Sequence, residues 1–219
     1  MICGSIEASE QIATFRRNPS NCSTNEGVLG PLEVASPARH PRGHIMLSVR
    51  LVKDEDRAAI DHLIRTAFVS PGASVDSVQE APLVATLRAN GDVLLEQVLV
   101  DQTGAISAHV AVSKVSLLPD EGLLAGQVAP LSVSPESQGK GHGSTLMQAM
   151  ADSAKELGID VLFVLGDPDY YDRLGFKSCS VKSAYGPSEY YRAKFLQAEP
   201  QDLSHCEARL APAFAALDE

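Results

Sequence analysis

The stretch QGKGHGST, residues 138–145, decides the fold of this chain. An apolar run at residues 128–133 leads into it, and a segment with helical spacing follows it. Apolar residues recur in that segment at intervals of three and four: Leu146, Met147, Met150, Ala154 and Leu157. This period predicts a helix with one buried face, which begins at the glycines and ends at Gly158 in the C′ position. The predicted order is strand, glycine loop, helix.

The glycine loop has the properties of an anion site. Gly139, Gly141 and Gly143 stand at alternate positions, so the backbone can approach a ligand without Cβ atoms in the way. The helix start adds unpaired N–H groups and the positive end of the helix dipole. Several charge-assisted hydrogen bonds, each worth about 1.5–3 kcal/mol, would hold a pyrophosphate there.

Two common nucleotide motifs do not fit the loop. A Walker A motif has its lysine directly before Ser or Thr, whereas Lys140 lies inside the glycine run. The dinucleotide fingerprint needs a third glycine where this chain has Ser144. A nucleotide-binding protein is therefore the disfavoured alternative, and it would bind ATP better than CoA.

The pattern Gln138-x-x-Gly141-x-Gly143 resembles the acyl-CoA pyrophosphate motif of the GNAT N-acetyltransferases, Gln/Arg-x-x-Gly-x-Gly/Ala. The residues before it, 131–138, are similar to the L-x-V-x-P-E-x-Q lead-in of that family. Residues 170–176 are similar to its Y-x-x-x-G-F ending. The match is specific because three separate segments agree in order and spacing.

Within that family, YhbS-type predicted acetyltransferases carry a segment similar to GDPDYY, residues 166–171. The resemblance covers about residues 47–197 and implies an α/β (α+β) fold, the GNAT acyl-CoA N-acyltransferase fold. We therefore expect a GNAT domain at residues 46–197, with a mixed, mostly antiparallel sheet flanked by helices.

The resemblance also implies how acetyl-CoA would bind as the acyl donor. Its pantetheine arm would insert where two central strands part, at a bulge marked by Pro130, and bond to the backbone near Leu131 and Val133. His142 is expected to be a solvated loop side chain, and Lys140 either pairs with a phosphate or is plain surface charge. The predicted cofactor-binding residues are Leu131, Ser132, Val133, Gln138, Gly139, Lys140, Gly141, His142, Gly143 and Ser144.

The implied chemistry is direct attack of a neutral amine on the thioester in a ternary complex. Tyr171 occupies the family position of the tyrosine that protonates the leaving thiolate, although Tyr170 could be the inward one instead. Some family members carry a glutamate base where this chain has Ala129, so we expect a water relay or a residue from the loops of the first two helices to serve instead. The loop at residues 70–73 is our candidate for acceptor choice.

The rest of the chain alternates between strand and helix patterns. Helices are predicted over residues 59–68 and 77–89, with a short one that Asp167 caps at its N-terminus. Strands are predicted at residues 47–53, 93–100, 105–117, 123–133 and 161–165, from Phe176, and last at residues 190–196.

Composition fits one domain of a cytoplasmic protein. The 219 residues are 44% apolar, and no run reaches transmembrane length. With 28 acidic and 18 basic residues the net charge is −10, which disfavours nucleic acid and suits an amine acceptor. The four cysteines show no metal-ligand spacing, so we expect reduced thiols and no metal. Because no run reaches transmembrane length, we expect no membrane partner. A homodimer is compatible with these properties.

The two ends differ from the domain. Residues 1–45 are rich in Ser, Asn, Pro and Gly without any period, which predicts a disordered extension. This extension is either a regulatory tail or the product of an upstream start codon, with Met46 as the alternative start. Residues 198–219 are predicted to be a tail that packs on the domain.

The predicted function is transfer of an acetyl group from acetyl-CoA to a primary amine of a small molecule or a protein. A non-catalytic acyl-CoA-binding module is the first alternative, because no base is visible in the sequence. A transferase with another acyl group or a hydroxyl acceptor is the second. The fold class does not separate these alternatives.

Overall fold

The computed structural model describes residues 46–184, 188–197 and 202–217. The predicted disorder of residues 1–45 lies outside this part of the chain, as do residues 198–201 and 218–219 of the predicted tail.

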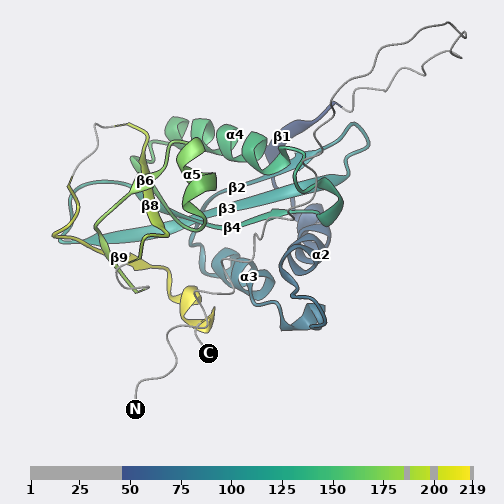
Figure 1. Ribbon diagram of the computed structural model, residues 1–219, viewed down its shortest axis with the longest axis horizontal. Coiled ribbons are helices and arrows are strands. Elements are labelled where there is room, and N and C mark those ends of the chain that lie inside the picture. The colour runs from purple at the N-terminus through teal and green to yellow at the C-terminus, as the bar shows by residue number, and fades with distance from the viewer. Residues whose placement is uncertain (1–45, 185–187, 198–201, 218–219) are drawn as a thin grey trace, which may run out of the picture.

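A nine-stranded sheet is formed by the described residues, in the order β1-β2-β3-β4-β5-β8-β6, with β9 beside β3 and β7 beside β9 (Figure 1). The strands are β1 Ser48–Leu51, β2 Val93–Val100, β3 Ile106–Leu118, β4 Ala125–Val133, β5 Val161–Leu165, β6 Lys177–Ser178, β7 Lys182–Ser183, β8 Tyr191–Phe195 and β9 Glu207–Leu210. The β4–β5 and β7–β9 pairs are parallel and the other pairs are antiparallel. The predicted mixed, mostly antiparallel sheet is confirmed.

Helices cover both faces of the sheet (Figure 1). They are α2 Arg57–Phe68, α3 Glu80–Asn90, α4 His142–Glu156 and α5 Pro168–Arg173. On one face α4 buries Leu146, Met147 and Met150 against β2 and β3. On the other, α2 and α3 pack around Val98 and Val100 of β2. Each face is apolar because strand side chains alternate between the two sides.

Strand β4 carries two irregularities that position the site. Val110 pairs with Leu131 and Val112 with Val128, so Ala129 and Pro130 together stand opposite the single residue Ala111. This is the predicted bulge at Pro130. The parallel pairing of β4 with β5 ends at Gln127 and Phe163, so β4 has no β5 partner from residue 128 onward. The two central strands therefore part just before the bulge.

Two predictions about the C-terminal half are wrong. The strand at residues 190–196 is not the last, because β9 follows it and pairs with the end of β3. β9 joins β3 where β3 extends beyond its pairing with β2. Leu157, predicted to face the core, is 56% exposed, because α4 ends at Glu156 and the chain turns there. Ile159, beyond Gly158, is buried in its place.

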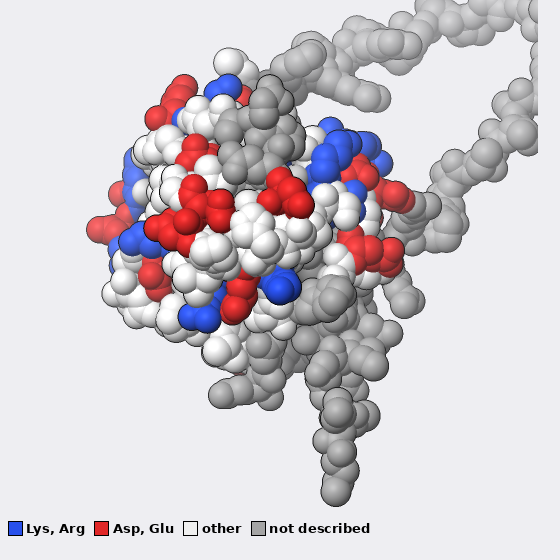
Figure 2. All heavy atoms as spheres, turned by 90° about the vertical axis from the view of Figure 1, so that its left-hand side faces the viewer, with Lys and Arg blue, Asp and Glu red and all other residues white. Residues whose placement is uncertain are grey.

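The described part of the predicted tail packs on the domain. Besides β9, the turn of 3-10 helix Pro212–Leu217 places Phe214 against Leu83 and Leu87 of α3. On the side of the molecule that lies at the left of Figure 1, acidic and basic side chains are intermixed on the described surface (Figure 2). No helix in the described ranges is long and apolar enough to cross a membrane.

Candidate active site

The glycine loop forms an open backbone cradle at the start of α4. Gly139 and Gly141 have φ angles of +72° and +86°, and a Cβ at either position would meet no atom within 4 Å. Gly141 is the N-cap residue, without a side chain to cap the helix. Within the described residues, no hydrogen bond engages the backbone N–H groups of residues 141–144. These unpaired donors, at the positive end of the α4 dipole, fit an anionic group such as a pyrophosphate.

Side chains of the motif fix the loop rather than fill it. The Gln138 side-chain amide donates to the Val133 carbonyl oxygen at 3.2 Å, so it ties the loop to the end of β4. His142 is half-buried, and its Nδ1 lies 2.9 Å from the Ser107 hydroxyl on β3. The expectation of a solvated His142 is therefore wrong, because the helix start lies against the β3 strand. Lys140 is exposed, as a surface charge would be.

The end of β4 has no strand partner on the side of the gap between β4 and β5, where the Val133 carbonyl accepts from the Gln138 side chain. Ser134 donates its N–H to the Ser107 carbonyl, and the register continues with Ser132 opposite His109. Because hydrogen-bonded pairs alternate along an antiparallel ladder, Ser132 bonds to β3, whereas Leu131 and Val133 point their backbone groups away from it. Leu131 and Val133 thus face the side that β5 has left. This is the arrangement expected for a bound pantetheine arm.

Tyr171 is the inward tyrosine of α5. It is 9% exposed and belongs to the core cluster under α4, with its ring 5.5 Å from that of Phe176. A Cβ at Gly166 would lie 2.4 Å from a Tyr171 ring carbon, so glycine there makes room for the ring. Burial, with smaller contributions from Tyr170 and Asp167, raises the pKa of the Tyr171 hydroxyl. That hydroxyl has no hydrogen-bond partner among the described residues and stays protonated.

Tyr170 lies against the glycine loop instead. Its hydroxyl bonds to the Ser144 side chain, and burial raises its pKa in spite of that bond. A Cβ at Gly143 would lie 3.0 Å from the Tyr170 hydroxyl and 3.3 Å from Val133. The two neighbouring tyrosines are thus separated in role, one at the loop and one in the core. Asp167 starts their helix as the predicted cap, because its carboxylate accepts the Asp169 N–H at 2.9 Å.

A buried charged cluster on the other face of the sheet was missed from the sequence. Arg88 of α3 donates Nε to Glu96 of β2 at 2.9 Å and its Nη2 to the other carboxylate oxygen. His109 of β3, with no exposed surface, places Nε2 2.6 Å from Glu96. Burial lowers the pKa of His109 against the opposing effect of Glu96. Burial by itself would raise the pKa of Glu96, but the bonds from His109 and Arg88 outweigh it and lower that pKa.

Two polar atoms beside this cluster lack partners. His109 Nδ1 and the Ser132 hydroxyl are both buried without a hydrogen bond among the described residues. Their residues are direct cross-strand neighbours and so project from the same face. The signal in the sequence was weak, because His109 and Glu96 lie in apolar runs and are thirteen residues apart.

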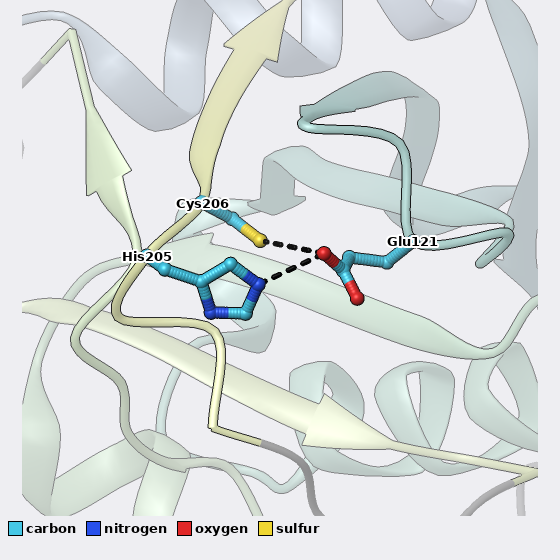
Figure 3. A group of neighbouring side chains, drawn as sticks. All are labelled: Glu121, His205 and Cys206. Carbon is cyan, nitrogen blue, oxygen red and sulfur yellow. Dashed lines mark hydrogen bonds and ion pairs between the residues drawn. The ribbon is translucent and has the colours of Figure 1, made fainter.

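One group of described side chains has donors placed as metal ligands would be (Figure 3). The Glu121 carboxylate lies 2.8 Å from His205 Nε2 and 3.7 Å from the Cys206 sulfur. These contacts join the β3–β4 loop to the residues just before β9, at the end of the sheet away from the glycine loop (Figure 1). The three side chains already satisfy one another, and burial, aided by Glu121, raises the pKa of the Cys206 thiol. No metal is expected from the sequence, and nothing in acetyl transfer requires this group.

Comparison with known proteins places this architecture among the acetyltransferases. A family model described as Acetyltransferase (GNAT) domain matches residues 95–178. The N-acetyltransferase YhbS of Escherichia coli K12 is 34% identical over 122 residues, which is 56% of this chain and 68% of that protein. The chain therefore belongs to the GNAT N-acetyltransferase family and is an acyltransferase.

Two solved structures share the fold. The crystal structure of YhbS from Escherichia coli in complex with CoA has a TM-score of 0.69 at 26% identity, covering 81% of this chain and 96% of that one. A GNAT acetyltransferase from Brucella melitensis, in complex with acetyl-CoA, has a TM-score of 0.64 at 25% identity, covering 78% and 99%.

Proposed function

We propose that this protein transfers the acetyl group of acetyl-CoA to a primary amine by direct attack within a ternary complex. The observation that carries the proposal is the combination of four unpaired N–H groups at residues 141–144 with the free edge of β4 beside them. A pyrophosphate would bind the N–H groups, and an extended arm that contains amides would lie along the edge of β4. The structural relatives in complex with CoA and acetyl-CoA support this choice of ligand.

Each part of the substrate then has its residues. The N–H groups of residues 141–144 would hold the pyrophosphate, and the backbone of Leu131 and Val133 would pair with the pantetheine amides. The amine nitrogen attacks the thioester carbon, and the C–S bond breaks as the amide forms. Tyr171 gives its proton to the departing thiolate.

The acceptor is proposed only as a class. A lysine-like amine with a pKa near 10.4 must lose a proton before it attacks, which costs about 4–5 kcal/mol at pH 7. The net charge of −10 favours the approach of such a cationic acceptor. Ala129, at the place of the family glutamate, offers no carboxylate, so the proton must leave by another route.

Acetyl-CoA affinity should depend on the glycine loop. Gly141→Val places a branched side chain at a φ of +86°, which the loop can relieve only by turning its N–H groups away. We expect calorimetric titration of the full chain to show a Kd for acetyl-CoA at least tenfold weaker in this variant. ATP should bind the wild type more weakly than acetyl-CoA.

Gly158→Val is the matched control, because Gly158 has a φ of +79° and equally open space but lies at the other end of α4. It should carry similar strain and retain wild-type affinity. No binding of acetyl-CoA by a folded wild type would remove the proposal. Binding without turnover on any amine would favour the non-catalytic alternative.

A further inference from the structure

The buried side chains behind β4 point to a proton route that begins where the amine must react. Ser132 lies between Leu131 and Val133, the residues that face the proposed thioester site, and its side chain projects from the α2–α3 face. On the α4 side the same segment packs into an apolar cluster with Tyr171. The buried polar residues that adjoin this segment on the α2–α3 face are Ser132, Ser134 and His109.

The tautomer of His109 follows from its partners. Glu96 is held as an anion by Arg88, and a carboxylate can only accept, so His109 Nε2 must carry the hydrogen of their 2.6 Å contact. Nδ1 is then an unprotonated nitrogen with a free lone pair, fully buried and unpaired. The His109 ring is thus held like the imidazole of a catalytic triad. There, one ring nitrogen donates to a carboxylate that fixes the ring, and the second nitrogen accepts the proton.

Nδ1 and the Ser132 hydroxyl make no hydrogen bond to each other, and neither atom has another partner among the described residues. Two orphaned polar atoms on neighbouring strands are what a buried water bridges. We propose that His109 is the proton-relay residue of the acetyl transfer: a water held between its Nδ1 and Ser132 takes the proton of the acceptor ammonium and passes one to Nδ1.

The proposal rests on the proposed function and balances as follows. The ammonium N–H bond breaks and its electron pair stays on nitrogen, which then attacks the thioester carbon. The first proton reaches Nδ1 through the water, and the imidazolium is stabilised by Glu96. After the attack the nitrogen loses its second proton as the C–S bond breaks, and this proton replaces the one that Tyr171 gives to the thiolate. Among the described residues, Glu96 and Arg88 are the charged groups that act on His109. Because burial lowers the pKa of His109, the ring is neutral and ready to accept near pH 7.

Nitrogen NMR of the full chain with labelled histidine tests the tautomer without any acceptor. His109→Gln identifies the His109 signals among those of the six histidines. We expect a neutral ring with the proton on Nε2 at pH 7 and above. A proton on Nδ1, or a charged ring at pH 7, would overturn the relay.

Turnover with two kinds of nucleophile tests the role. The probes are hydroxylamine, which is already uncharged at pH 7, and a panel of charged amines, namely spermidine, tyramine and a protected lysine. For the best charged amine, His109→Gln should lower kcat/KM about 10²-fold. The variant should also lack the acid limb that the wild type shows in its pH–rate profile. The hydroxylamine rate and the Kd for CoA should change less than threefold. Ser132→Ala should show the same pattern more weakly.

His205→Gln is the control, because His205 is 54% exposed at the far end of the sheet. Equal losses with both nucleophiles would reveal a merely structural role for His109, and equal rates for wild type and His109→Gln would overturn the relay. A wild type that acetylates neither probe contradicts the proposed function, while the NMR result still decides the state of His109.

Discussion

Tyr171→Phe should lower kcat by about 10²–10⁴-fold while leaving the affinity for CoA unchanged. The variant keeps the ring contacts with Phe176 and Gly166 and removes only the hydroxyl. That hydroxyl has no structural partner among the described residues, and burial raises its pKa, so it remains a proton donor throughout the working pH range. Steady-state release of CoA thiol and calorimetric Kd values would measure the two quantities separately.

Tyr170→Phe is the matched comparison, one residue earlier on the same helix. It removes the bond to Ser144 beside the glycine loop, so we expect a Kd for CoA a few times weaker and a kcat close to that of the wild type. The reverse result, with kcat lost in Tyr170→Phe and kept in Tyr171→Phe, would transfer the acid role to Tyr170.

The central part of this fold could be predicted because its signals are local. Three positive-φ or closely packed glycines, the period of α4 and the continuous apolar run of β5 each lie within a few residues. Pro130 also marked its own bulge, since proline cannot donate to a ladder. The strand, loop and helix of the proposed cofactor site are set by neighbours in sequence, and there the prediction of elements is confirmed.

The features that were missed depend on long-range register. β9 is four residues long and is a strand because the end of β3 has no β2 partner there. His109 and Glu96 meet because the β2–β3 hairpin places Val98 opposite His109 and Ala111 opposite Glu96. A shift of one residue would have sent one of them to the α4 face. No local pattern encodes such a meeting, so the sequence left open a water relay or a residue from the loops of the first two helices and did not point to His109 or Glu96.

Glu96→Ala should cost about 3–5 kcal/mol of the free energy of unfolding at pH 7.5, the largest stability effect we expect in this protein. Glu96 is the common partner of Arg88 and His109, and the three side chains are 10%, 17% and 0% exposed. The substitution leaves a guanidinium and an imidazole N–H buried without an acceptor. Urea unfolding followed by circular dichroism would measure the shift in midpoint.

The loss should depend on pH in a direction that the pKa of Glu96 fixes. Its pKa is lower in the folded chain than the ordinary 4.5, so its stabilising effect is complete above about pH 4.5 and is lost as the pH falls through the folded value. The difference in free energy of unfolding between wild type and Glu96→Ala should therefore decrease only at acid pH. Asp54→Ala is the control, since it removes an equally short 2.6 Å ion pair with Arg57 whose side chains are 91% and 60% exposed, and it should cost less than about 1 kcal/mol. If both variants lost the same stability, the buried cluster would contribute no more than a surface pair, and the fixed orientation that the His109 relay requires would lose its support.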